Sequence, residues 1–176
     1  MLSEEEMLRR LSSELKPSRF AHSLGVRDTA VELARIYGCD EEKCHLAGIL
    51  HDCAKYMSLE QMLDIIQKGG IELYPHEDEY EPLLHAPAGA ALAKLSYGIN
   101  DGQILSAIRK HTTGKDMDLL EAIIFVADMI EPTRTYIPGC DELRALARND
   151  IFAAVEKCKQ MTKEYCESQG HRVFSI

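Results

Sequence analysis

The chain has 176 residues, 45% of them hydrophobic and 28% charged, which is typical of one globular domain with a substantial core. Its formal net charge of −9 disfavours nucleic acid as a partner, because such a surface repels a polyanion. No apolar run approaches the roughly 20 residues that span a bilayer, and the N-terminal MLSEEEMLRR is charged where a signal peptide would be apolar, so we expect a cytoplasmic protein with no membrane contact.

Apolar residues recur at helical spacing along most of the chain, and no segment has the period of two that is typical of a strand. Capping residues, prolines and glycines divide this pattern into separate helices. In chain order, the predicted helices cover residues 3–15, 17–38, 41–55, 58–69, 83–97, 100–111 and 116 or 118 to 131, and two more begin near 141 and 150. The sequence therefore predicts an all-α protein, a single domain over residues 1–176 with eight or nine helices.

Two stretches fall outside this helical pattern. Residues 71–82, which include Pro75 and Pro82 and several acidic side chains, are the least periodic part of the chain and predict a loop. Residues 170–176 form a short C-terminal tail that contains His171.

An adjacent His51-Asp52 pair follows an apolar run in the segment LAGILHDCAK. Imidazole nitrogen and carboxylate oxygen are both good metal ligands. Neighbouring residues on a helix point about 100° apart, so both side chains reach one ion only near a helix end or a kink. Residues 53–57 would supply that exit from the third predicted helix.

Asp128 is out of place in the almost wholly apolar segment LLEAIIFVADMIE. A carboxylate buried in such a helix is costly unless a cation or strong hydrogen-bond donors compensate its charge. An ion pair with Arg134 and hydrogen bonds from a helix N-terminus are two structural explanations. A divalent metal ion is a third, since His22, His51 and Asp52 would complete a set of two nitrogen and two oxygen ligands with Asp128. Such a set leaves positions open for a water molecule, which a metal ion makes nucleophilic near neutral pH.

The order of these residues resembles that of the HD-domain metal-dependent phosphohydrolases, which have a lone histidine, an adjacent His-Asp pair and a distant aspartate. The matching metal positions are His22, His51, Asp52 and Asp128. The segments ILHDCAKYM and ADMIEPTRTYIPG, with His85 in LLHAPAGA and His111 in IRKHTTG, resemble the YqeK-type branch, described as symmetrical diadenosine tetraphosphate hydrolases. This likeness covers nearly the full chain and implies an HD-type helical bundle.

The resemblance also implies a reaction. Water activated on a divalent transition metal attacks a phosphorus of the bridge in a bis(5'-nucleosyl) tetraphosphate such as diadenosine tetraphosphate, and two nucleoside diphosphates, here ADP, are released. Iron is the favoured metal, with cobalt and manganese as alternatives, and a homodimer is expected from the family. Two other functions stay open: hydrolysis of a nucleoside monophosphate, cyclic nucleotide or guanosine alarmone by another HD activity, and a nucleotide-sensing HD module without turnover.

Three cations near these motifs are candidates for phosphate binding, because negative charge builds on phosphoryl oxygens in the transition state. Lys55 lies one helical turn past His51, and Arg19 lies three residues before His22. Arg134 follows the proline that ends the apolar helix. Each has an alternative interpretation as a solvated surface charge.

The remaining candidates have roles that the sequence leaves open. His85 and His111 would bind a second metal ion, hydrogen-bond phosphate or protonate the leaving group. Thr112 and Thr113 offer donors to phosphate or simply form a turn. Asp52 is a candidate base for the attacking water, although a metal-bound carboxylate is a poor base. A contact from His171 to the nucleotide rests on the family resemblance alone.

Overall fold

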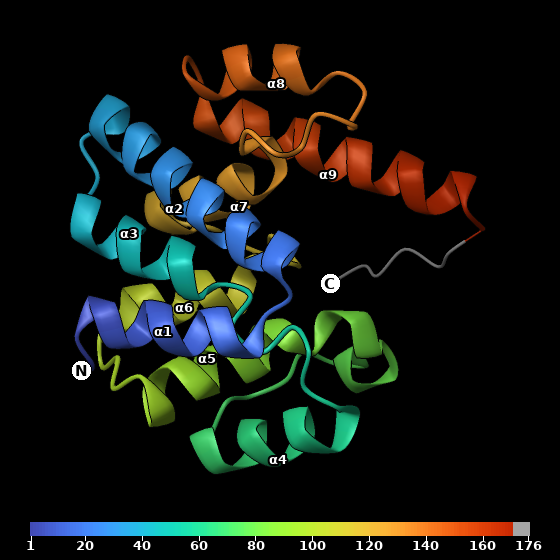
Figure 1. The fold of residues 1–176 in the computed structure, drawn as a ribbon. Helices are drawn as coiled ribbons and strands as arrows, with labels where there is room; N and C mark the ends of the chain where they lie inside the picture. Colours follow the sequence, from blue (N-terminus) through green and yellow to red (C-terminus); the bar gives the residue numbers. More distant parts are fainter. Residues whose placement is uncertain (171–176) are drawn as a thin grey trace.

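The most apolar predicted helix, α7 (Leu119–Ile130), lies at the centre of the fold. In the computed structural model, which describes residues 1–170, α7 packs against α2, α3, α6, α8 and α9 (Figure 1). The nine α-helices of the described residues are α1 (Glu4–Glu14), α2 (Pro17–Tyr37), α3 (Glu41–Leu50), α4 (Leu59–Gly69), α5 (His85–Ser96), α6 (Gly102–Lys110), α7, α8 (Cys140–Ala147) and α9 (Ile151–Ser168). No strand occurs within these residues, so the all-α prediction is confirmed.

Local capping fixes many of the helix ends that the sequence predicted. Ser58 and Gln61 form the predicted capping box of α4, and α2 ends at Gly38 in the left-handed conformation. The sixth helix is capped by Asp101, one residue later than predicted. The third helix is shorter than predicted: α3 ends at Leu50 and residues 51–56 form turns. The His-Asp pair therefore lies directly beyond a helix end.

Two glycines let neighbouring helices approach the end of α3 closely. A Cβ atom on Gly48 would lie 2.8 Å from the Cα of Arg27, so α2 and α3 are in backbone contact there. A Cβ atom on Gly89 of α5 would lie 3.3 Å from the carbonyl oxygen of His51. These approaches bring α2 and α5 to the turn that follows α3.

The predicted loop between α4 and α5 is held to the body of the protein by a buried ion pair. It contains two short 3-10 helices, Glu77–Glu79 and Glu81–Leu83. The carboxylate of Glu77 is fully buried and binds the Arg109 guanidinium, with 2.8 Å between Nη1 and Oε1. The Tyr74 ring stacks on the same guanidinium, 4.2 Å from its central carbon. The loop therefore has a fixed position at the N-terminus of α5, which begins at His85.

Figure 1 shows α8 and α9 at one end of the molecule and α4 and α5 at the other. Among residues 1–170, no helix is both long enough and apolar enough to cross a membrane.

Candidate metal centre and adjoining cavity

The four predicted metal ligands come from α2, from the turn after α3 and from α7, and their side chains lie close together. His22 belongs to α2, His51 and Asp52 follow α3, and Asp128 lies near the end of α7. Nε2 of His22 lies 3.0 Å from Oδ1 of Asp128 and 3.9 Å from Oδ2 of Asp52. Nε2 of His51 lies 3.4 Å from Oδ2 of Asp52 and 3.8 Å from Oδ1 of Asp128. Two nitrogens and two oxygens therefore face one another across distances that one ion can bridge.

His85 and His111 extend the same cluster on the other side of Asp52. Their Nε2 atoms are 3.1 Å apart, and they lie 3.1 Å and 3.6 Å, respectively, from Oδ1 of Asp52. The rings of His51 and His111 meet edge to face, with centroids 5.0 Å apart. Asp52 thus directs one carboxylate oxygen towards His22 and His51, and the other towards His85 and His111.

All four histidines are held in the same way, through Nδ1. In three of them Nδ1 lies 2.7 Å from the backbone carbonyl oxygen three residues earlier, which pairs His51 with Gly48, His85 with Pro82 and His111 with Ile108. A carbonyl oxygen only accepts, so Nδ1 carries the hydrogen. Each ring of the three therefore offers the lone pair of Nε2 to the centre, which is the usual form of a metal-binding histidine.

The fourth histidine is held by a residue that the sequence reasoning missed. Glu131 is fully buried, and its Oε1 lies 2.9 Å from Nδ1 of His22. The backbone N–H and the hydroxyl of Thr133 both donate to the same carboxylate. On α2, Gly25 leaves room for it, because a Cβ atom there would lie 2.4 Å from Oε2 of Glu131. The only signal in the sequence is an acid three residues after Asp128, at the end of an apolar helix.

The unpaired atoms of the cluster fit a metal ion. His22 Nε2, His51 Nε2 and Asp52 Oδ1 are buried and have no aligned hydrogen bond among the described residues, although oppositely charged groups are near. Two overlapping sets have ligand atoms within 4.8 Å of one another: His22, His51 and Asp128, and His51, Asp52 and His111. Buried polar atoms without partners are rare in native proteins. The donor chemistry therefore suits a divalent transition metal.

The charge states of the two aspartates and of His85 favour metal binding. Burial alone would raise the pKa of the Asp52 carboxyl, but the imidazoles of His51 and His111 outweigh it and hold that pKa well below its usual range. The pKa of Asp128 is lowered in the same way, because His22 and His51 outweigh its burial. Burial lowers the pKa of His85 to about 4. Burial alone would lower the pKa of His51, but the carboxylates of Asp52 and Asp128 outweigh it and raise that pKa. Because ionised carboxylates and neutral imidazoles are the forms that bind metals, an ion that binds at His51 displaces a proton.

The three predicted cations all border the centre. Arg19 Nη1 lies 2.8 Å from Oδ2 of Asp52, and Lys55 Nζ lies 3.0 Å from Nε2 of His85. Arg134 Nη2 lies 2.9 Å from Oδ1 of Asp128, so the ion pair considered as a structural explanation for this aspartate is present beside the candidate ligands. All three cations are partly exposed and can meet an anion that approaches from solvent.

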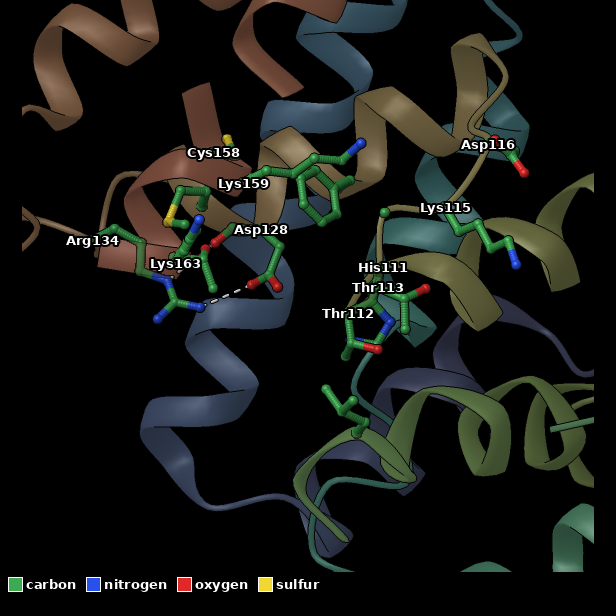
Figure 2. A pocket seen from close by; sticks show the side chains of 15 residues that line it. His111, Thr112, Thr113, Lys115, Asp116, Asp128, Arg134, Cys158, Lys159 and Lys163 are labelled. Atoms are coloured by element: carbon green, nitrogen blue, oxygen red, sulfur yellow. Dashed lines mark hydrogen bonds and ion pairs between the residues drawn. The ribbon is translucent and has the colours of Figure 1, made fainter. Parts of the chain in front are cut away.

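A cavity of about 810 Å³ adjoins the centre, and His111 and Asp128 belong to its wall. Figure 2 shows Asp128 and Arg134 on one side of it and His111, Thr112 and Thr113 on the other. The two threonine hydroxyls are buried and have no hydrogen-bond partner among the described residues. The lining also includes residues that the sequence reasoning did not select: Lys115, Phe125, Met129, Lys159 and Lys163. The candidate contact from His171 lies outside the described residues.

This helical fold and its His/Asp cluster define an HD domain. The family model described as HD domain matches residues 19–133, and the chain belongs to this family. Within the family, the chain is closely related to the symmetrical bis(5'-nucleosyl)-tetraphosphatases.

Three relatives support this relationship. The Bacillus subtilis "Bis(5'-nucleosyl)-tetraphosphatase, symmetrical" is 40% identical over 98% of this chain and 92% of its own length. The Staphylococcus aureus protein of the same name is 45% identical over 82% of this chain and 74% of its own. A crystal structure of a "predicted HD superfamily hydrolase involved in NAD metabolism" from Clostridium acetobutylicum has a TM-score of 0.93 and 42% identity, and the match covers 99% of this chain and 92% of that one.

Proposed function

We propose that this protein hydrolyses bis(5'-nucleosyl) tetraphosphates, such as diadenosine tetraphosphate, symmetrically to two nucleoside diphosphates. Relatives that bear the name of this activity match it over nearly the full length. The observation that carries the proposal is the cluster of four Nε2 atoms around the Asp52 carboxylate, beside a cavity with cations in its wall. A metal-dependent phosphohydrolase needs both parts: ligands for the metal ion and cations that bind the phosphates of the nucleotide.

His22, His51, Asp52 and Asp128 are the proposed ligands of a divalent metal ion, for which iron is favoured over cobalt and manganese. When bound, such an ion supplies Lewis-acid polarisation of water and of phosphoryl oxygens. Glu131 orients His22 by accepting the hydrogen of Nδ1. This contact fixes both the tautomer and the direction of the Nε2 lone pair.

His85 and His111 are better placed as ligands of a second ion than as proton donors. Their Nδ1 atoms are bonded to backbone carbonyls, so both Nε2 atoms point at Oδ1 of Asp52. To act as an acid, His85 would have to carry a second proton on Nε2, only 3.0 Å from the ammonium of Lys55. Two adjacent positive charges oppose that protonation.

The remaining proposed residues bind and orient the polyphosphate. Arg19, Lys55 and Arg134 lie at the edge of the centre, where they would offset the negative charge that grows on phosphoryl oxygens. Thr112 and Thr113 would offer their unpaired hydroxyls to the substrate from the opposite wall. Asp52 accepts a hydrogen bond from Arg19 and is a proposed metal ligand, and both interactions lower the basicity of its carboxylate. We therefore favour its role as a ligand over a role as the base for water.

The test is a turnover assay with product analysis. Purified protein supplied with iron, cobalt or manganese is incubated with diadenosine tetraphosphate, and the nucleotides are separated by chromatography. ADP as sole product supports the proposal. AMP with ATP, or cleavage of a cyclic nucleotide only, would favour another HD activity, and binding without turnover would favour a nucleotide-sensing module. The expected homodimer is tested separately by light scattering of the purified protein.

A further inference from the structure

The cavity beside the metal centre gathers positive charge on a protein whose net charge is −9. Three lysines line it together with Arg134: Lys115, Lys159 and Lys163. Asp116 and Asp128 are the acids in its described wall, and Asp128 already faces His22 and Arg134. An anionic ligand is therefore attracted to this cavity more strongly than to the rest of the surface, which is acidic.

The two lysines of α9 reach the cavity because of their position on the helix. Lys159 and Lys163 are four residues apart, so they share one face, and Cys158 and Thr162 of that face also line the cavity. Lys157 belongs to the same helix but is exposed and does not line the cavity. The lysines of α9 therefore lie on two faces: Lys159 and Lys163 on the face that lines the cavity, and Lys157 on a face that does not.

Gly114, in the turn after α6, packs against the aliphatic part of Lys159. Gly114 has a left-handed backbone, with φ of +62°, and a Cβ atom there would lie 3.0 Å from the Phe125 ring and 3.1 Å from Cε of Lys159. The turn after α6 therefore packs directly against both side chains. The ammonium groups have only surface partners: Lys159 lies 3.0 Å from Glu156, and Lys163 lies 3.9 Å from Glu167. Such exposed pairs are weak and exchange readily for a stronger anion.

We propose that Lys159 and Lys163 of α9, assisted by Lys115, are specificity-determining residues that bind the phosphates of one nucleoside diphosphate half of the substrate. The nucleoside of this half lies on the apolar surface of Phe125 and Met129. A volume of about 810 Å³ is within the usual range for a small-molecule site. The cavity opens on the centre through His111 and Asp128, so a nucleotide held there has its terminal phosphate at the metal ligands. This inference rests on the proposed function.

The test compares a double variant, Lys159→Gln with Lys163→Gln, with the matched control Lys157→Gln. Calorimetry measures ADP binding at two salt concentrations, and steady-state kinetics measure diadenosine tetraphosphate hydrolysis. We expect the Kd for ADP and the KM to rise about tenfold in the double variant, with kcat nearly unchanged and a weaker salt dependence of binding. The control should match the wild type. Circular dichroism checks that both variants are folded, and Lys115→Gln provides a second variant outside α9.

The outcomes separate this inference from the proposed function. Equal ADP affinity in the double variant and the Lys157→Gln control would overturn the role of the α9 lysines, even if the wild type hydrolyses the substrate. The same holds if the wild type binds no ADP. Weakened ADP binding without any hydrolysis by the wild type would keep the cavity assignment and reject the proposed reaction.

Discussion

Around the metal centre a hydrogen-bond acceptor fixes each histidine ring through Nδ1, whereas Lys159 and Lys163 of the adjoining cavity pair only with exposed glutamates. His51 and Asp52 are 0% and 2% exposed, and the side chains of Lys159 and Lys163 are 40% and 62% exposed. Metal coordination demands ligands that are already in place, because a small displacement costs affinity. Recognition of a charged, flexible nucleotide tolerates mobile cations. The two regions should therefore respond very differently to substitution.

Asp52→Ala should have the largest effect, because this carboxylate faces both halves of the histidine cluster. We expect turnover to fall by at least about a thousandfold and the protein to lose its metal, while helicity is largely kept. Kinetics, metal analysis and circular dichroism measure these three properties. Asp64→Ala, at an exposed ion pair on α4, is the control. Wild-type rates in Asp52→Ala would remove this residue from the site.

Asp128→Leu should also abolish activity, but with a different effect on stability. Its carboxylate is held by His22 and Arg134, and replacing a paired, partly buried acid with an apolar side chain is often neutral or stabilising. We therefore expect the Tm of the metal-free protein to stay the same or rise. Thermal unfolding with and without metal measures this. A clear fall in the Tm of the metal-free protein would indicate that the ion pair with Arg134 serves stability.

Glu131→Gln tests whether the support behind His22 matters to the metal. An amide is a weaker acceptor than a carboxylate for the Nδ1 hydrogen, and we expect metal affinity to fall about 10- to 100-fold. Titration with a metal of known concentration measures the change. The matched control is Glu121→Gln at the other end of α7, where a buried carboxylate caps the helix and pairs with Lys110. The control should lower stability without changing metal affinity, and equal metal affinities in both variants would contradict the positioning role of Glu131.

Lys55→Ala should have the smallest effect of the four, since its ammonium borders the centre without belonging to the ligand set. Loss of one cation that contacts phosphate should raise KM about tenfold and change kcat less. Steady-state kinetics at two ionic strengths measure the effect and its electrostatic origin. Lys68→Ala, which removes an exposed cation of α4, should leave kinetics unchanged. Identical kinetics in both variants would show that Lys55 is a surface charge that does not contact the substrate.

The sequence predicted most of the fold because its caps and apolar periodicity are local signals. The Ser58 capping box and the end of α2 at Gly38 are examples. The early end of α3 escaped prediction, because apolar periodicity continues past Leu50 while the chain turns there to place His51 and Asp52 against other helices. Tertiary contacts thus overrode a local preference.

The proposed ligands could be selected from the sequence because an acid in an apolar helix and an adjacent His-Asp pair require an explanation. The residues that hold these ligands and the neighbouring loop in place could not be selected in this way. Glu131 meets His22 across 109 positions of the chain, and Arg109 meets Glu77 across 32. Lys159 and Lys163 have a spacing that is common on any exposed helix, so only the folded chain distinguishes them from Lys157.

The close contact between α2 and α3 at Gly48 has a consequence for the geometry of the proposed metal centre. His22 and His51 approach the centre from these two helices, and their ring centroids are 5.2 Å apart. Because a methyl group at position 48 would collide with the Arg27 backbone, Gly48→Ala would force the two helices apart and increase the distance between the two imidazoles. Gly48, whose carbonyl oxygen also holds Nδ1 of His51, would thereby control the separation of the two imidazoles that an ion between them has to bridge.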